Sequence, residues 1–407
     1  MSRTESTGAV PSLAERVASL KTTAKPSSIQ FEPPVGREVL AWDPVSGWRG
    51  QVLMFASNNY LGLWAHPHVS EAVQSAISRF GTGGGGSPQV TGRYTPQRRL
   101  EEKFSELRKA EATMLFNSAY AANLGLASAL VGGPDVALVD ADIHTSFMDG
   151  LLLGRGTTLK LAHNQAADLE EKLRLAKTRS GGSVVVAVSG LYGLDATLAP
   201  LNRIAPACTR AGAYLVLDDV HSMGTLGEHG RGAAEHFGVE EQVALTVTSF
   251  STLFGVAGAA VSGPADLIEY LRLRAHSFTN STAPSPLVAE TVLAGLEVME
   301  REPERLRQLK QHAAALKAGL AAQGIAATVA GGIGIIRVPP GMDVDWAREF
   351  LLRAGLYVHY LPHPAVPRHE ERFRVSLSAM HRPEDIQRLI ACMAQVWRTA
   401  APASAPH

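Results

Sequence analysis

Short apolar segments alternate with amphipathic segments along the central part of the chain. Four of them have the length and near-continuous apolar character of buried strands: residues 135–139, 184–188, 214–217 and 244–247. Helical patterns lie between them and before them. One opens with Thr95-Pro96, where we expect Thr95 to cap a helix whose residues Leu100 and Phe104 share one face. This alternation predicts an α/β fold with a mostly parallel, doubly wound sheet.

The pattern changes towards both ends of the chain. A short amphipathic helix at 12–21 and a stretch rich in Pro and Ser at 22–36 indicate an N-terminal arm. After residue 302 a long helical pattern is followed by strands and two further helices, which indicates a small α+β domain. We therefore expect four parts: an arm at 1–50, a large cofactor-domain-like α/β domain at 51–295, a small domain at 296–398 and a tail at 399–407.

Composition narrows the class of protein. Lys plus Arg and Asp plus Glu both number 38, so the formal net charge of zero argues against a general nucleic-acid binder. The two cysteines, Cys208 and Cys392, are too few for a disulfide framework or a cysteine zinc site, and we expect no metal. No run approaches 18 consecutive apolar residues, and the first residues lack a secretory pattern. We expect a cytoplasmic protein without a membrane span.

Polar residues follow the predicted strands, where doubly wound sheets bind their ligands. Asp218 and His221 come directly after the strand at 214–217, and His144 follows the strand at 135–139. An Asp with a His nearby suits acid–base chemistry or binding of a protonated heterocycle, but a capped polar loop is the commoner explanation of so short a motif. The glycine run at 81–87 permits a close approach to a ligand, although it is not a dinucleotide fingerprint.

Taken together and in order, these motifs resemble those of the α-oxoamine synthase family. The matching segments are SNNYLGL (57–63), the glycine run, LFNSAYAAN (115–123), His144, DDVH (218–221), LGEHGRG (226–232), Phe250-Ser251 with Gly255, Ser281-Thr282 and FRVSLSAMH (373–381). The family includes 8-amino-7-oxononanoate synthase and serine palmitoyltransferase. Its members are fold-type-I pyridoxal phosphate (PLP) enzymes, which condense an amino acid with an acyl thioester, lose CO2 and form active sites at a dimer interface.

The resemblance implies a role for each matching residue. Asp218 would pair with the pyridine nitrogen, His221 with the phenolic oxygen, and His144 would stack on the ring. Asn59 and Arg374 would face the carboxylate of an amino acid, for which a guanidinium fork is well suited. The residues near the PLP phosphate would be Ser118, Ala119, Tyr120 and Ser249. Ser281 and Thr282 would reach the phosphate from the neighbouring subunit.

The chain departs from the family pattern at the position of the PLP-binding lysine. The family has a stretch like TFSKALG, and here the stretch at 249–255 reads SFSTLFG, which places Thr252 where the lysine belongs. A threonine hydroxyl cannot form an imine, so we expect no covalent cofactor; non-covalent PLP remains possible but is not expected. Further departures lie nearby: Pro88 replaces an Arg, Gln97 a His, and Ser189 a Glu.

These departures favour an acyltransferase that does not use PLP Schiff-base chemistry. An acyl group from CoA or a carrier protein would pass to the amine or hydroxyl of a small-molecule acceptor, possibly an amino acid. His221 or His144 would act as general base, and Asp218 would orient the imidazole. Ser189, Ser251 and Thr252 are the hydroxyl groups available to take part, and none lies in a nucleophile motif.

Other hypotheses remain open. The chain could be a catalytically silent subunit that pairs with a lysine-bearing homologue, as one serine palmitoyltransferase subunit does, instead of forming a homodimer. It could also catalyse a PLP-dependent condensation with the cofactor held non-covalently, or be a decayed paralogue without a site.

Overall fold

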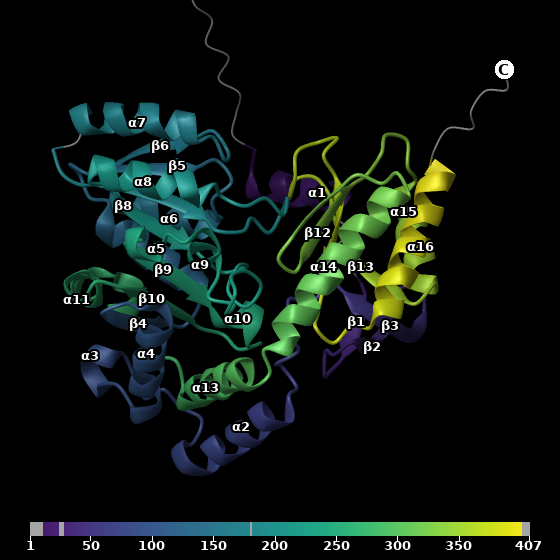
Figure 1. Ribbon diagram of the computed structural model, residues 1–407, viewed down its shortest axis with the longest axis horizontal. Coiled ribbons are helices and arrows are strands. Elements are labelled where there is room, and N and C mark those ends of the chain that lie inside the picture. The colour runs from purple at the N-terminus through teal and green to yellow at the C-terminus, as the bar shows by residue number, and fades with distance from the viewer. Residues whose placement is uncertain (1–10, 24–27, 180, 401–407) are drawn as a thin grey trace, which may run out of the picture.

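The protein has two lobes, each built around one sheet (Figure 1). The computed structural model describes residues 11–23, 28–179 and 181–400. The predicted tail at 399–407 lies almost wholly outside the described residues. Within the described residues, no helix is both long and apolar enough to cross a membrane.

The large sheet has the predicted mostly parallel, doubly wound organisation. Its strand order is β4 (Ala112–Phe116), β10 (Ala259–Gly263), β9 (Leu245–Ser249), β8 (Tyr214–Asp218), β7 (Val184–Ser189), β5 (Val136–Asp140) and β6 (Thr157–Leu161). The pairs from β9 to β6 are parallel, and β10 runs antiparallel to both of its neighbours. The predicted fold class, a fold-type-I PLP-transferase-like α/β fold, is confirmed.

Helices cover both faces of this sheet because its strands are apolar on both sides. In β5, Val136 and Leu138 belong to one buried cluster and Ala137 and Val139 to the other, as the alternation of side chains in a strand requires. The first cluster includes residues of α2 (Pro67–Phe80), α4 (Thr95–Arg108), α7 (Ala166–Arg179), α8 (Leu201–Ala211), α9 (Ala233–Phe237), α10 (Phe250–Leu253) and α13 (Pro286–Arg301). The second includes residues of α5 (Ala119–Leu130), α6 (Thr145–Gly154), α11 (Ala265–Arg274) and α12 (His276–Thr279).

The start of α4 differs from the prediction in its capping residue. Thr95 is already the first helical residue, and Tyr94 is the N-cap. Gln97 closes the helix end, because its Oε1 accepts a hydrogen bond from the Tyr94 N–H at 2.9 Å. One more short helix, α3 (Pro88–Thr91), precedes α4, and the 3-10 turn η1 (Glu240–Gln242) precedes β9.

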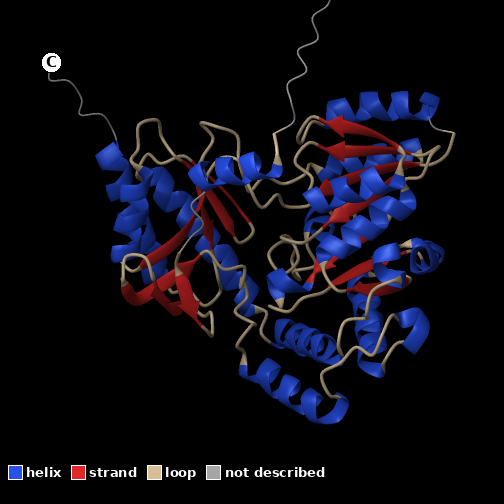
Figure 2. Cartoon of the chain, turned by 180° about the vertical axis from the view of Figure 1, so that it is seen from behind, coloured by secondary structure: helices blue, strands red, loops and turns tan. Residues whose placement is uncertain are grey.

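The second sheet joins segments from both ends of the chain. Its order is β1 (Gln30–Glu32), β2 (Glu38–Trp42), β3 (Arg49–Phe55), β13 (Leu356–Leu361), β14 (Arg372–Ser376), β12 (Ile333–Arg337) and β11 (Ala327–Ala330). Three helices belong to this lobe: α14 (Glu304–Ala322), α15 (Val344–Arg353) and α16 (Pro383–Ala400) (Figure 2). The helix α1 (Leu13–Thr23) precedes it, as the arm pattern predicted.

The expected domain boundary at residue 50 does not coincide with this sheet. β3 pairs in parallel with β13, with Leu53 opposite Leu356, so residues 30–55 belong structurally to the small domain. The apolar side chains of Val39, Val52 and Met54 form a small buried cluster there. Because the partner strand lies about 300 residues away in sequence, the local pattern around residue 50 could not reveal this pairing.

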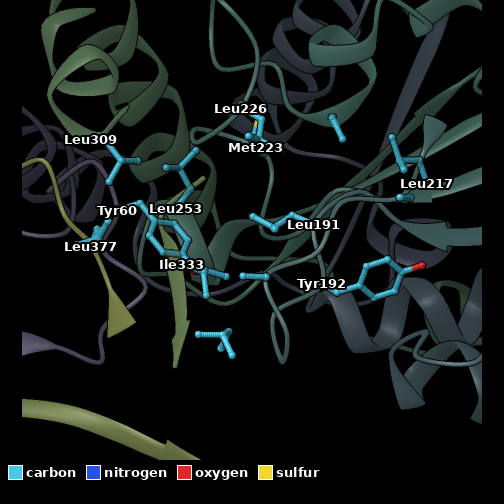
Figure 3. Close-up of a cluster of buried hydrophobic side chains, with 14 of the residues drawn as sticks. Tyr60, Leu191, Tyr192, Leu217, Met223, Leu226, Leu253, Leu309, Ile333 and Leu377 are labelled. Atoms are coloured by element: carbon cyan, nitrogen blue, oxygen red, sulfur yellow. The ribbon is translucent and has the colours of Figure 1, made fainter. Parts of the chain in front are cut away.

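The two lobes share one apolar core. Tyr60, Leu191 and Ile333 come from three distant segments and lie together in the same buried cluster (Figure 3). Gly332 lies against Tyr60, because a Cβ at Gly332 would stand 2.5 Å from the Tyr60 ring. This contact fixes the small lobe against the carboxyl edge of the large sheet, where the polar residues predicted from sequence are found.

Candidate active site

Four neighbouring strands of the large sheet end in polar residues at one edge. Asp140, Ser189, Asp218 and Ser249 are the last residues of β5, β7, β8 and β9, and all four are buried. Because these strands are adjacent and parallel, their carboxyl ends form one continuous polar edge. The strand ends at which the sequence predicts a ligand site therefore lie together along one edge of the large sheet.

Asp218 is connected to His144 through two other side chains. The Asn123 amide donates to Asp218 Oδ2 at 3.0 Å and to Ser146 Oγ at 3.1 Å. Ser146 Oγ lies 2.7 Å from His144 Nδ1. Burial raises the pKa of Asp218, although the hydrogen bond from Asn123 opposes this. Asn123 was not singled out from the sequence, but a lone amide in the apolar helix α5 was a usable signal.

His221 belongs to a second polar group that faces the small lobe. Its Nδ1 lies 3.1 Å from Tyr60 Oη, which accepts from Arg374 at 3.2 Å. Burial first, and then the positive charge of Arg374, lower the pKa of His221 to about 3, so the imidazole is neutral. Gly193 packs against this ring, because a Cβ there would stand 2.6 Å from His221 Nε2.

Asn58, rather than the predicted Asn59, stands beside Arg374. Arg374 donates to Asn58 Oδ1 at 3.2 Å. Asn59 points elsewhere: its amide donates to the Val35 carbonyl, and its oxygen accepts from the Trp64 N–H. Neighbouring residues of a loop point in different directions, which the motif alone did not resolve. Arg374 retains a buried Nε without a hydrogen-bond partner among the described residues.

Thr252 is buried in α10, beneath the turn that carries His221. Its hydroxyl donates to the Val220 carbonyl at 2.9 Å, so the proton is engaged by the backbone. Ser249 caps α10, and its Oγ lies 2.8 Å from Ser251 Oγ. Within the described residues, the buried Ser189 makes no hydrogen bond to His144 or His221; its N–H donates to Tyr192 Oη at 3.4 Å.

The expected phosphate-facing residues lie at the start of α5. Ser118 is the N-cap and accepts from the Ala121 N–H at 3.0 Å, which leaves Ala119 and Tyr120 in the first turn. Tyr120 donates to Asp149, and its ring meets the His144 ring edge-on, with centroids 6.2 Å apart. The helix N-terminus and its free N–H groups favour an anion here.

Ser281 and Thr282, which are expected to serve a neighbouring subunit, contact Asn117 within the chain. Asn117, which directly precedes Ser118, donates to Ser281 Oγ at 2.9 Å and to the Thr282 carbonyl. Within the glycine run, Gly84 packs on this loop, because a Cβ there would stand 2.2 Å from the Ala283 carbonyl, whereas a Cβ at Gly81 would have no atom of the described residues within 4 Å. Gln97, which replaces a family His, donates to the Pro284 carbonyl of the same loop.

A buried ion pair supports the turn that follows β8. Arg108 Nη1 lies 2.7 Å from Asp219 Oδ2, and the two side chains are 6% and 0% exposed. Asp219 also accepts from Ser222 and, at 3.1 Å, from the Ala233 N–H. Asp219 therefore orients the turn from below while Asp218 faces the site. The sequence showed the Asp pair but gave no signal that Arg108 would be its partner.

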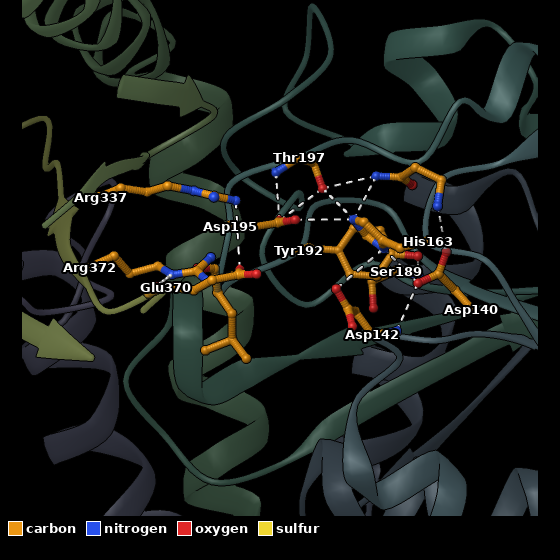
Figure 4. A network of polar contacts seen from close by, with 12 residues as sticks. Asp140, Asp142, His163, Ser189, Tyr192, Asp195, Thr197, Arg337, Glu370 and Arg372 are labelled. Carbon is orange, nitrogen blue, oxygen red and sulfur yellow. Dashed lines mark hydrogen bonds and ion pairs between the residues drawn. The ribbon is translucent and has the colours of Figure 1, made fainter. Parts of the chain in front are cut away.

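His163 is a second polar centre that sequence reasoning missed (Figure 4). Its Nδ1 lies 2.7 Å from Asp140 Oδ1 and its Nε2 3.1 Å from Asp195 Oδ2. Burial would lower the pKa of His163, but the hydrogen bonds with the two carboxylates raise it to about 10. The imidazolium therefore ties the loop that carries Tyr192 and Gly193 to the end of β5.

The charge of His163 predicts a pH-dependent contribution to stability. Since its pKa is raised in the folded state, its contribution is complete below about pH 6.5 and is lost as the pH rises through about 10. We expect His163→Gln to lower the free energy of unfolding by about 2 kcal/mol at pH 6, less than a fully buried pair because the ring is partly exposed. Urea unfolding of both proteins from pH 6 to 10 should show this difference shrinking, and a constant difference would contradict it.

Known proteins resemble the chain over most of its length. Residues 50–392 match the family described as aminotransferase class I and II. A putative 8-amino-7-oxononanoate synthase from Desulfovibrio desulfuricans is 36% identical over 356 residues, which cover 87% of this chain and 90% of the relative. Serine palmitoyltransferase from Sphingobacterium spiritivorum is 34% identical over 352 residues, or 86% and 88% of the two chains. The solved structure of Sphingomonas wittichii serine palmitoyltransferase matches with a TM-score of 0.86 and 28% identity, over 95% of this chain and 96% of that one.

The chain belongs to the aminotransferase class I and II family. Within it, the relatives named above are 8-amino-7-oxononanoate synthases and serine palmitoyltransferases, so the predicted resemblance to α-oxoamine synthases is confirmed.

The family implies PLP as the cofactor, and other similar serine palmitoyltransferase structures are described as containing it. The expectation that PLP is not retained therefore has no support from the relatives. The residues here fit non-covalent PLP: Asp218 is a buried carboxylate of raised pKa that a protonated ring nitrogen would stabilise, and Asn123 keeps a buried Oδ1 without a described partner. When bound, PLP supplies an aldehyde and an electron sink.

Lysines with a described ammonium contact are engaged away from Thr252. Lys103 pairs with Glu300 and Lys109 with Glu240. Lys172 pairs with Asp168, and Lys310 donates to the Gly227 carbonyl. None of these four contacts lies at the strand-edge site.

Proposed function

We propose that the chain transfers an acyl group from a CoA or carrier-protein thioester to an amine or hydroxyl acceptor, without a covalent bond between protein and PLP. The observation that carries this proposal is Thr252. It is buried at the site, its hydroxyl donates to the Val220 carbonyl, and its place in the SFSTLFG stretch corresponds to the family lysine. Asp218 and Asn123 stay buried at the strand edge and are hydrogen-bonded to each other, which favours a working site over a decayed one.

His144 is the better general base of the two predicted histidines. His221 is enclosed by Tyr60 and Gly193, and a pKa of about 3 makes it a weak base. In the exposed His144, Nδ1 accepts from the Ser146 N–H at 3.3 Å and lies 2.7 Å from Ser146 Oγ, while Nε2 has no partner among the described residues. Nε2 acts as the base in the tautomer whose Nδ1–H donates to Ser146 Oγ, and the charge of Asp218 then stabilises the imidazolium through Asn123.

The proposed acyl transfer needs only the acceptor, the thioester and His144. The acceptor nitrogen or oxygen attacks the thioester carbonyl, and its proton passes to His144 Nε2. The carbon–sulfur bond breaks, the thiolate leaves, and it takes a proton from His144 or water. The Arg374 guanidinium offers a binding point for an acceptor carboxylate, since its Nε is buried without a described partner.

The test is release of thiol from acyl-CoAs by PLP-free protein in the presence of candidate amine and hydroxyl acceptors. We expect His144→Ala to lower kcat/KM at least about a hundredfold, because a general base contributes that much or more. The control is His68→Ala, which removes a partly exposed imidazole that pairs with Glu297 and lines neither the strand-edge site nor a cavity.

Three outcomes would count against the proposal. They are no thiol release across the panel, equal activity in His144→Ala and wild type, and activity that requires a lysine-bearing homologue. The last result would identify the chain as the silent subunit of a heterodimer. A homodimer with activity of its own is what the proposal expects.

A further inference from the structure

A cavity of about 800 Å³ lies between the two lobes and shares no residue with the strand-edge site. One wall is the loop from Thr225 to Arg231, and the other is α14 together with the end of β11. Gly227 and Gly331 lie in its lining, where Gly227 packs against Glu235 and Gly331 against Thr225. The volume is within the range of small-molecule sites in proteins.

The α14 wall has a regular arrangement of small and basic side chains. Lys310, Ala313, Ala314 and Lys317 line the cavity and stand at positions i, i+3, i+4 and i+7, which form one stripe of a helix. Two alanines between two lysines leave a shallow apolar surface with an ammonium group at each end. Leu226 and Val329 extend the apolar surface on either side.

The two lysines have no carboxylate partner among the described residues. Lys310 donates to the Gly227 carbonyl at 2.6 Å, and Lys317 forms no ion pair in the described part of the chain. Two of the three carboxylates in the lining are engaged: Glu235 pairs with His229 and Arg231, and Glu240 with Arg231 and Lys109. The third, Glu228, is exposed to solvent on the loop opposite α14. Positive charge on the α14 wall is therefore available to an anion.

We propose that this cavity binds an organic phosphate of nucleotide size, with its phosphate held by Lys310 and Lys317 and its flat apolar part on Ala313 and Ala314. A compact ammonium binds phosphate as a point charge, and two of them one helical stripe apart suit a ligand with more than one anionic oxygen. Small side chains leave room for a planar ring. The same chemistry is offered by a free nucleotide and by the nucleotide part of CoA.

Calorimetric titration of the full-length protein with AMP tests the proposal directly. We expect AMP to bind, and Ala314→Leu to weaken that binding about tenfold or more, because the added side chain projects into the cavity without changing charge. The matched control is Ala315→Leu on the next helical position, which does not line the cavity. The double variant Lys310→Gln/Lys317→Gln should weaken AMP binding about tenfold, while Lys177→Gln on α7 should not.

A parallel titration with CoA separates the two sources. If Ala314→Leu weakens CoA and AMP equally, the cavity takes the nucleotide part of the thioester carrier. If Ala314→Leu weakens the binding of AMP but not that of CoA, the cavity takes free nucleotides. Either result supports an organic-phosphate site. Absence of AMP and phosphate binding at millimolar concentration overturns the proposal. The proposal is also overturned if Ala314→Leu and Ala315→Leu bind AMP with equal affinity and have the same melting temperature.

Discussion

Replacing Arg108 with alanine is expected to lower the free energy of unfolding by about 3–5 kcal/mol. The substitution leaves the fully buried carboxylate of Asp219 without its charge partner, 2.7 Å away in the native protein. It also removes the hydrogen bond from Arg108 to Thr248 at 2.6 Å and the one to the Arg231 carbonyl. A buried charge cannot recover its hydration, so most of the cost comes from Asp219 and not from the lost bond itself.

The matched control is Arg98→Ala on the same helix. Arg98 pairs with Glu102 at 3.5 Å, but both side chains are 65% exposed, so its loss should cost less than about 0.5 kcal/mol. Chemical denaturation of the three proteins at neutral pH measures both effects. If Arg108→Ala and Arg98→Ala lower the free energy of unfolding by similar amounts, the ion pair between Arg108 and Asp219 does not stabilise the turn.

Replacing Thr252 with lysine is expected to convert the protein into one that attaches PLP covalently. Thr252 is buried beside the His221 turn, and burial lowers the pKa of a lysine amine, which favours its reactive neutral form. The other groups that would hold the cofactor are present at the strand edge: Asp218, Asn123 and His144. Visible absorption and intact mass after borohydride reduction measure the attachment.

Thr252→Met is the control for this substitution. Methionine has nearly the length of lysine but no amine, so it should bind PLP only in a form that dialysis removes. Covalent attachment in Thr252→Met would show that another side chain reacts. Failure of Thr252→Lys to attach PLP, while it folds as stably as Thr252→Met, would mean that residue 252 does not face the cofactor position.

The sequence predicted the parts of the fold that depend on local patterns. The apolar runs became β5, β7, β8 and β9 to within a residue or two, because strands buried on both faces must be apolar throughout. The strand order of the second sheet was not predictable in this way. The pairing of β3 with β13 depends on contacts between opposite ends of the chain, and β13 itself carries polar residues such as His359.

The candidate site was predicted by motif and corrected by geometry. Asp218, His144 and His221 lie at the carboxyl edge of the large sheet, and Arg374 approaches from β14 of the small lobe through Tyr60. The hydrogen bonds among them were not predictable: Asp218 connects to His144 through Asn123, while His221 bonds to Tyr60. Which of Asn58 and Asn59 faces Arg374 depends on loop dihedral angles that the residue types do not determine.

The central claim is that this chain carries no covalent link to PLP, because residue 252 lacks an amine. The most direct measurement is the intact mass of the wild-type protein after saturation with PLP, borohydride reduction and unfolding, with Thr252→Lys treated in parallel. The account predicts an unmodified wild-type mass and a single pyridoxyl addition to the lysine variant. A pyridoxyl group fixed stoichiometrically to the wild-type chain would contradict it.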